Sequence, residues 1–170
     1  MIDDFTILKN RAKILAKRKT ENDTGVNRLM IVEFLLIPER YALPGEAIAE
    51  VLPLRDFTPI PGTPAFVVGV INARGKIISV INLKSFLHLK EQGITELNKV
   101  VIMKNEQMEF GILVDAILGA REISLNSLHS PPATLEEAGV EYIEGVTEDG
   151  LVLLNSKAII SNKLLIINQK

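Results

Sequence analysis

The sequence predicts a mostly β protein made of small barrels or a sandwich, with one helix at its N-terminus. Many short apolar runs are rich in β-branched residues, and Gly, Pro and Asp turn signals separate them. The 170 residues fit one domain or two small ones that share a core. Residues 145–155 weakly echo residues 69–82, since each stretch has a Gly-Val pair, a turn, a Gly and an apolar run. Two small barrels that share an apolar seam would satisfy all of these features.

The N-terminal part differs in character from the rest. We expect residues 1–27 to form an amphipathic helix and a linker, and residues 28–170 to form the β domain. Four apolar residues share one face of the helix predicted over residues 2–19: Phe5, Leu8, Ala12 and Leu15. This helix could dock on the body, bind a partner, or contact a membrane or nucleic acid through its basic face. We favour docking, because the apolar stripe is narrow and contains no Trp.

The first half of the β domain is expected to hold four strands and one or two helical turns. The strands cover residues 29–37, 41–44, 67–71 and 77–83, and the helical turns lie within residues 83–89. The last two strands form a hairpin and are expected to be buried on both faces. Residues 47–52 are apolar, and their periodicity does not decide between a helical turn and a strand. Pro53 to Pro64 is expected to be a structured connection that wraps over the core.

The second half is expected to form two further hairpins. Their strands cover residues 99–104 with 108–114, and 142–146 with 151–154, and another strand covers residues 116–124 with a bulge or bend at Gly119. Asp115 is expected to cap a turn or the next element. Residues 134–137 fit a capping box for a short helical turn. The tail, residues 156–170, mixes apolar pairs with polar residues and should pack on the body.

Composition and motifs argue against an enzyme. The chain has no Cys, and its two histidines, His88 and His129, have no acid at metal-ligand or dyad spacing. It contains no P-loop, no Gly-rich dinucleotide turn and no Gly-x-Ser-x-Gly elbow. We therefore expect no catalysis, no metal site and no cofactor.

The same composition argues against nucleic-acid binding and membrane insertion. The 19 basic and 21 acidic residues give a net charge of −2, which attracts neither nucleic acid nor an anionic membrane. Two Tyr and no Trp leave few side chains on which bases could stack. No apolar run is long enough to span a bilayer, and the N-terminus lacks the features of a secretory signal. We expect a cytoplasmic protein.

The central hairpin carries an unusual polar tip at Asn72, Arg74 and Gly75. Gly75 can adopt the positive φ that a hairpin turn of this length usually needs. Arg74 places a permanent charge and a five-donor fork at the end of an otherwise apolar hairpin. A solvated turn arginine is the simplest interpretation of this residue alone, and a partner-binding group is the alternative.

These motifs resemble those of the CheW-like chemotaxis adaptor family, from about Arg28 to the C-terminal region. The most specific part is Gly69-Val-Ile-Asn-Ala-Arg-Gly75, followed by Ile77-Ile-Ser-Val-Ile-Asn-Leu-Lys84. Further matching stretches, in the family's order, are Tyr41–Pro44, Ile48–Val51, Thr58–Pro61, Thr63–Phe66, Phe110–Asp115 and Tyr142–Val146. The sequence departs from the family pattern at four positions, where the family usually has Leu, Pro, Asp and Arg: Ala73, Ser79, Asn82 and Lys84.

The resemblance implies a CheW-like fold of two five-stranded SH3-like β-barrels that share an apolar interface, and it implies no catalysis. It implies two protein partners, the cytoplasmic tip of a methyl-accepting chemoreceptor and the regulatory domain of a CheA-type histidine kinase. The candidate partner-binding residues are Ile48, Glu50, Val51, Asn72, Arg74 and Gly75. Ile48 and Val51 could supply apolar contact. Arg74 and Glu50 could supply charge and orientation, since an arginine can grip a carboxylate through two hydrogen bonds.

Two alternatives stay open from the sequence. One is a small β-barrel module that binds nucleic acid or a small ligand, and a salt-dependent shift with DNA or RNA would be its sign. The other is an adaptor-fold scaffold that has lost receptor binding, which the departures at Ser79, Asn82 and Lys84 would allow.

Overall fold

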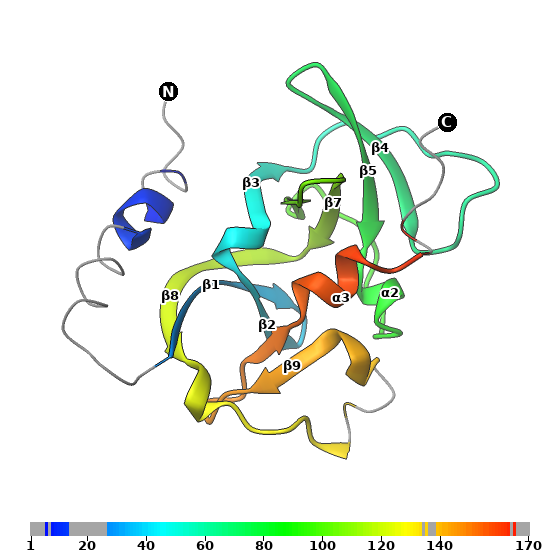
Figure 1. Ribbon diagram of the computed structural model, residues 1–170. Coiled ribbons are helices and arrows are strands. Elements are labelled where there is room, and N and C mark those ends of the chain that lie inside the picture. Colours follow the sequence, from blue (N-terminus) through cyan, green and yellow to red (C-terminus); the bar gives the residue numbers. More distant parts are fainter. Residues whose placement is uncertain are drawn as a thin grey trace.

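The computed structural model describes residues 6, 8–13, 27–133, 135, 139–163 and 165. They form two five-stranded sheets with only short helical segments, and a helix precedes the first strand (Figure 1). The prediction of a mostly β protein with an N-terminal helix is confirmed.

The first sheet combines early and late parts of the chain. In the order β8-β1-β2-β10-β9, its strands are Ala116–Ser124, Arg28–Leu36, Glu39–Pro44, Val152–Leu154 and Ile143–Val146. β1 pairs antiparallel with both β2 and β8. The register of β1 with β8 shifts between Glu33 and Phe34, opposite Gly119. The bulge expected at Gly119 is therefore present, and so is the expected hairpin of β9 and β10.

The second sheet is formed by the middle of the chain. In the order β3-β6-β7-β5-β4, its strands are Ile48–Pro53, Lys99–Lys104, Glu109–Val114, Lys76–Asn82 and Val67–Ala73. The pairs β4/β5 and β6/β7 are the two predicted hairpins. For residues 47–52 the sequence leaves helical turn and strand open. In the structure a 3-10 turn covers Gly45–Ala47, and the residues after it form β3. A bridge between Thr58 and Val70 ties the Pro-rich segment to β4, as expected for a structured connection.

Short helical segments lie between and after the strands. α2 covers Leu83–Phe86 and α3 covers Ser156–Ile160, and 3-10 turns cover Leu125–Ser127 and Val140–Tyr142. The helical turn predicted after β5 is confirmed by α2. The mixed tail has no clear hydrophobic period, so its sequence does not predict α3. Most of the predicted capping box, at residues 134–137, lies outside the described residues.

Three apolar clusters explain how the sheets share one core. The largest cluster takes residues from both sheets, such as Phe34 from the first and Met103 and Ile112 from the second. Each sheet also covers a smaller cluster of its own. In β6, Val101 belongs to the shared cluster, whereas Val100 belongs to the cluster of the second sheet. Alternate residues of one strand therefore serve two cores, which explains the nearly continuous apolar runs in the sequence.

The central hairpin is less buried than its sequence predicts. Ile78 and Val80 of β5 are buried, but Ile77 is 69% exposed and Ser79 is also exposed. This alternation is typical of a strand with one face toward solvent, so the expectation of burial on both faces is wrong here. The apolar run hides the alternation, because the outward-facing position 77 is itself occupied by isoleucine.

The N-terminal helix meets the body through a polar contact. Residues 8–13 are helical, and the predicted ends of the helix lie outside the described residues. Leu8, on the predicted docking face, is 51% exposed. Lys9 is partly buried, and its ammonium donates a hydrogen bond to the carbonyl of Ile48. Ala12, also on the predicted docking face, is partly buried, and Phe5 and Leu15 of that face lie outside the described residues, so the docking of this face stays a prediction.

Four charged side chains form a closed ring on the first sheet. Glu33 accepts hydrogen bonds from Arg40 at 2.8 Å and from Arg121 at 3.1 Å. Asp149, between β9 and β10, accepts one from Arg121 at 2.9 Å and lies 3.3 Å from Arg40. Acids and arginines alternate, so each charge has two opposite neighbours. This pairing explains how the Glu33 carboxylate can be buried in the middle of β1.

We expect Asp149 to make the stability of the fold depend on pH in the acid range. A hydrogen bond from Thr147, together with Arg121 and Arg40, lowers the pKa of Asp149 from 3.8 to about 2. A carboxyl group with a lowered pKa adds stability above pH 3.8, and this stability is lost as the pH falls through about 2. Because the carboxylate is half-exposed, we expect a contribution of about 1 kcal/mol or less.

Urea unfolding of the wild type and of Asp149→Asn, between about pH 5 and pH 2, checks this expectation. The wild type should lose more of its unfolding free energy over this range than Asp149→Asn, which has no carboxylate to titrate at this position. Equal losses in the two proteins would contradict the role given to Asp149.

Candidate partner-binding surface

The tip of the β4–β5 hairpin is a tight turn with two consecutive residues in the left-handed region. Arg74 has a φ of 54° and Gly75 a φ of 82°. The side-chain oxygen of Asn72 accepts a hydrogen bond from the backbone N–H of Gly75 at 2.9 Å. Positive φ is expected at Gly75 but uncommon for an arginine, and unusual backbone positions of this kind cluster at functional sites.

Arg74 reaches from the hairpin to the opposite edge of the same sheet. Its guanidinium lies 3.1 Å from the carboxylate of Glu50 on β3, and the Arg74 side chain is 80% exposed. β3 and β4 are the two edge strands of the second sheet. The ion pair therefore spans the two edges, and it brings together the two candidate charges that lie far apart in the sequence.

The remaining candidate residues divide into surface and core positions. Asn72 and Gly75 are exposed, and Val51 is partly buried against the shared core. Ile48 is 1% exposed and belongs to the shared core itself, so its side chain is not available to a partner in this conformation. We call Glu50, Val51, Asn72, Arg74 and Gly75 the β3–hairpin surface.

Beside this surface lies a hollow of about 270 Å³. Its lining includes Arg74 and Asn72 from the hairpin and Leu52, Arg55 and Asp56 from the end of β3 and the segment after it. Arg55 and Asp56 are exposed charged residues that the sequence analysis missed. The only sequence signal for them is their position two and three residues after Pro53, near the start of the Pro-rich connection.

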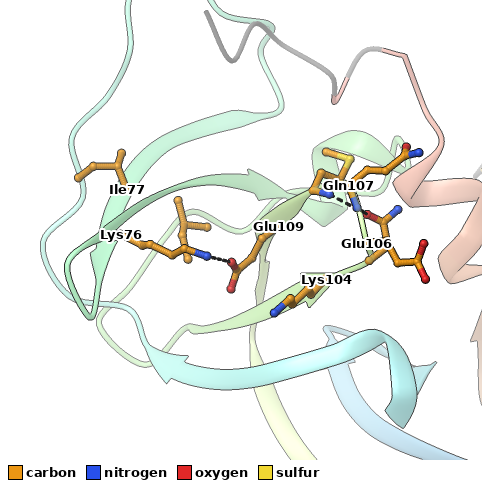
Figure 2. Close-up of a pocket in the computed structure, with 9 residues that line it drawn as sticks. Lys76, Ile77, Lys104, Glu106, Gln107 and Glu109 are labelled. Carbon is orange, nitrogen blue, oxygen red and sulfur yellow. Dashed lines mark hydrogen bonds and ion pairs between the residues drawn. The ribbon is translucent and has the colours of Figure 1, made fainter.

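A second hollow, of about 350 Å³, lies between β5 and the β6–β7 turn (Figure 2). In Figure 2 the side chain of Lys76 extends toward Glu109, and the two form an ion pair at 2.8 Å. Asn105 shapes the β6–β7 turn by accepting hydrogen bonds from the backbone N–H groups of Gln107 and Met108. Ile77, which also lines this hollow, adds an exposed apolar side chain close to the hairpin tip.

Two of the departures from the family pattern belong to the fold and not to the surface. Asn82 caps α2, since its side-chain oxygen accepts hydrogen bonds from the backbone N–H groups of Lys84 at 3.1 Å and Ser85 at 3.5 Å. Lys84 is buried, and its ammonium lies 2.5 Å from a carboxylate oxygen of Asp115. Ser79 alone among these three residues is exposed.

Asp115 is the centre of a buried polar cluster. Besides the Lys84 ammonium, it accepts hydrogen bonds from the backbone N–H of Ile37 at 2.7 Å and from the Asn98 side-chain amide at 3.1 Å. The expected turn-capping role of Asp115 is therefore present, in the turn between β1 and β2. Since Lys84 follows β5 of the second sheet, the cluster joins the two sheets.

We expect Asn82→Ala to lower the free energy of unfolding by about 1 kcal/mol, because α2 would lose its cap. Asn82→Asp should retain most of the stability, since a carboxylate caps a helix equally well. Chemical denaturation of the three proteins checks this prediction. An alanine variant as stable as the wild type would show that the cap contributes nothing.

The described residues offer little for metal chemistry. Among them, no group of three or more His, Asp or Glu side chains is arranged to hold a metal ion. None of the helices in the described part of the chain has the length and apolarity needed to cross a membrane.

Comparison with known proteins places this arrangement in context. The family model for the CheW-like domain matches residues 30–163. A chemotaxis protein CheW of Treponema pallidum (strain Nichols) is 34% identical over 158 residues, which cover 89% of this chain and 93% of that relative. Protein FrzA of Myxococcus xanthus is 31% identical over 109 residues, which cover 64% of this chain and 68% of FrzA.

A solved structure supports the same comparison. The crystal structure of scaffolding protein TtCheW from Thermoanaerobacter tengcongensis matches with a TM-score of 0.68 and 32% sequence identity. The match covers 76% of this chain and 90% of the TtCheW chain.

Proposed function

The chain belongs to the CheW-like family, and we propose from this membership that it is a cytoplasmic chemotaxis adaptor without catalytic activity. In this proposal it binds the cytoplasmic tip of a methyl-accepting chemoreceptor and the regulatory domain of a CheA-type histidine kinase, and so places the kinase under receptor control. The relatives named as chemotaxis proteins and the neighbour named as a scaffolding protein support an adaptor.

The observation that carries the proposal is the exposed ion pair between Arg74 and Glu50. An arginine at a positive φ that reaches across the sheet to a carboxylate is a costly arrangement for a residue with no function. Because the Arg74 side chain is 80% exposed and only Glu50 is partly buried, the pair contributes little to stability. An incoming helix with its own charges could exchange partners with Arg74 and Glu50, and this exchange would fix the orientation of the complex.

The apolar part of the interaction would come from the neighbouring side chains. Val51 follows Glu50 on β3 and is partly buried against the shared core, and the exposed Ile77 lies just beyond the hairpin tip. A receptor tip is a helical hairpin, and helices bind in grooves through apolar anchors with a few charges around them. The β3–hairpin surface and the hollow beside it have this composition.

The departures at Asn82 and Lys84 do not favour a scaffold that has lost its partners. Asn82 keeps the capping role of a short polar residue, and Lys84 keeps a cation opposite Asp115. Both residues therefore have contacts inside the fold, and neither belongs to the β3–hairpin surface.

Isothermal titration of the purified chain tests the proposal. The titrants are a receptor-tip fragment and the kinase regulatory domain from the same organism, and a DNA duplex at two salt concentrations tests the nucleic-acid alternative. We expect saturable binding to both proteins and none to DNA. Binding to DNA with a strong salt dependence, and to neither protein, would reject the adaptor function.

A further inference from the structure

The turn between β9 and β10 contains a dipeptide that is chemically labile in unfolded chains. Asp149 is followed by Gly150, and the sequence has no other Asp-Gly pair and no Asn-Gly pair. The backbone nitrogen of such a glycine can attack the aspartate carboxyl carbon, because glycine has no Cβ to hinder the approach. A C–N bond forms, and the N–H proton and the carboxyl hydroxyl leave as water. Addition of water then opens the resulting succinimide to aspartate or to isoaspartate, in which the backbone runs through the side-chain carbon.

Packing does not shield this turn from the reaction. Gly150 is exposed, and no atom of the described residues lies within 4 Å of the position that a Cβ would take there. The side chain of Asp149 is 49% exposed. Water therefore reaches both reacting groups, and any protection has to come from their hydrogen bonds and charges.

Both oxygens of the Asp149 carboxylate are held. The hydroxyl of Thr147 donates a hydrogen bond to one oxygen, and the guanidinium of Arg121 donates one to the other at 2.9 Å. Arg40 lies 3.3 Å from the second oxygen and also donates to the backbone carbonyl of Asp149. Attack by the glycine nitrogen requires the carboxyl group to turn toward it, and this turn would break charge-assisted hydrogen bonds.

The attacking nitrogen is held as well, and by the same residue. The N–H of Gly150 donates to the backbone carbonyl of Thr147 at 3.0 Å, and this proton must leave before the nitrogen can attack. Thr147 is buried, and its hydroxyl accepts a hydrogen bond from the N–H of Leu151 at 3.1 Å. Thr147 thus fixes both reacting groups and is itself fixed by the start of the next strand.

The charge state of Asp149 works in the same direction. The hydrogen bond from Thr147, with the charges of Arg121 and Arg40, lowers the pKa of Asp149 from 3.8 to about 2. The protonated carboxyl group is the reactive form, because its hydroxyl can leave as water. At about pH 6 this pKa leaves about sixtyfold fewer reactive molecules than an unshifted carboxyl group would have.

We propose that Asp149-Gly150 is a latent isomerisation site, and that Thr147, Arg121 and Arg40 keep it unreactive while the fold is intact. This inference does not depend on the adaptor function. Isoaspartate would add one carbon to the backbone of the β9–β10 turn and would move the carboxylate out of the charged ring with Glu33. A modified chain should therefore unfold more easily than an intact one.

The first test compares the folded and the unfolded wild-type chain. Both are incubated at about pH 6, one in buffer and one in concentrated urea, and chromatography of the proteolytic peptide that contains residue 149 separates isoaspartate from aspartate. We expect isoaspartate to form at least about tenfold more slowly in the folded chain. Equal rates in the two samples would overturn the proposal, and this comparison requires no variant.

The second test assigns the protection to the charged ring. Arg121→Gln removes one cation from the Asp149 carboxylate and leaves Thr147 and Arg40 in place. We expect isoaspartate to form about three- to tenfold faster in this variant than in the wild type, both in buffer. Circular dichroism of each sample shows that the chain is folded during the incubation.

Asn82→Ala is the matched control for a general loss of stability. It removes the cap of α2, far along the chain from the β9–β10 turn, and touches no member of the ring. Its rate of isoaspartate formation should equal that of the wild type. If Asn82→Ala reacts as fast as Arg121→Gln, the reaction follows global opening of the fold, and the ring does not protect the site. A rate in Arg121→Gln equal to that of the wild type would overturn the same assignment.

Discussion

Lys84→Met is expected to lower the free energy of unfolding by about 3 to 5 kcal/mol. Lys84 is buried, and its ammonium lies 2.5 Å from the Asp115 carboxylate. The substitution would leave that carboxylate inside the protein with the hydrogen bonds from Ile37 and Asn98 but without its counter-charge. Asp115 and Lys84 lie at the junction of the two sheets, so we expect the whole domain to be destabilised. Denaturant unfolding at neutral pH measures the loss of unfolding free energy.

Two further variants make this prediction sharp. Lys76→Met breaks an ion pair of similar length, at 2.8 Å to Glu109, but the Lys76 side chain is exposed. This variant should therefore lower the free energy of unfolding by less than about 1 kcal/mol. Lys84→Arg, which restores the residue usual in the family, should keep most of the stability because the cation remains. If Lys84→Met costs no more than Lys76→Met, the buried cluster does not hold the sheets together.

Arg74→Ala is expected to weaken binding to at least one of the two proposed partners by about tenfold or more, as truncation of an interface arginine often does. The Arg74 side chain is 80% exposed, so the free energy of unfolding should change by less than about 0.5 kcal/mol. Titration of the variant with the receptor-tip fragment and the kinase regulatory domain measures the affinity, and denaturation measures the stability.

The matched control for Arg74→Ala is Lys76→Ala. Lys76 is also an exposed cation that pairs with a carboxylate, and it lies two residues further along the same hairpin. We expect its affinities to stay within about twofold of the wild type. The affinity of Arg74→Lys should lie between those of Arg74→Ala and Lys76→Ala, because an ammonium cannot form the two parallel hydrogen bonds of a guanidinium. Unchanged affinities of Arg74→Ala for both partners would remove Arg74 from the site.

Local patterns predicted most of the strands. The positive φ of Gly75 and the bulge at Gly119 follow from a residue type with strong local preferences, whereas the turn that Asp115 caps, at Ile37, is distant in the sequence and depends on the fold. The exposure of Ile77 could not be predicted, because an isoleucine facing solvent looks the same in the sequence as one facing a core. The short helix α3 also gives no clear hydrophobic period.

The candidate site was only partly visible in the sequence. The hairpin tip was visible because Arg74 stands out between two apolar runs, but its pairing with Glu50 depends on the way the sheet brings its two edges together. Ile48 matches the family pattern, but its burial depends on three-dimensional packing that the sequence does not show. The Lys9 contact joins segments with no local relation in the sequence.

The central claim is that this chain links a receptor to a kinase, and sedimentation of a three-component mixture tests it most directly. The mixture contains the wild-type chain, the receptor-tip fragment and the kinase regulatory domain. The account predicts a boundary that contains all three proteins and disappears when the chain is left out. If the two partners instead exclude each other from the chain, or if neither binds, the chain is not an adaptor between them.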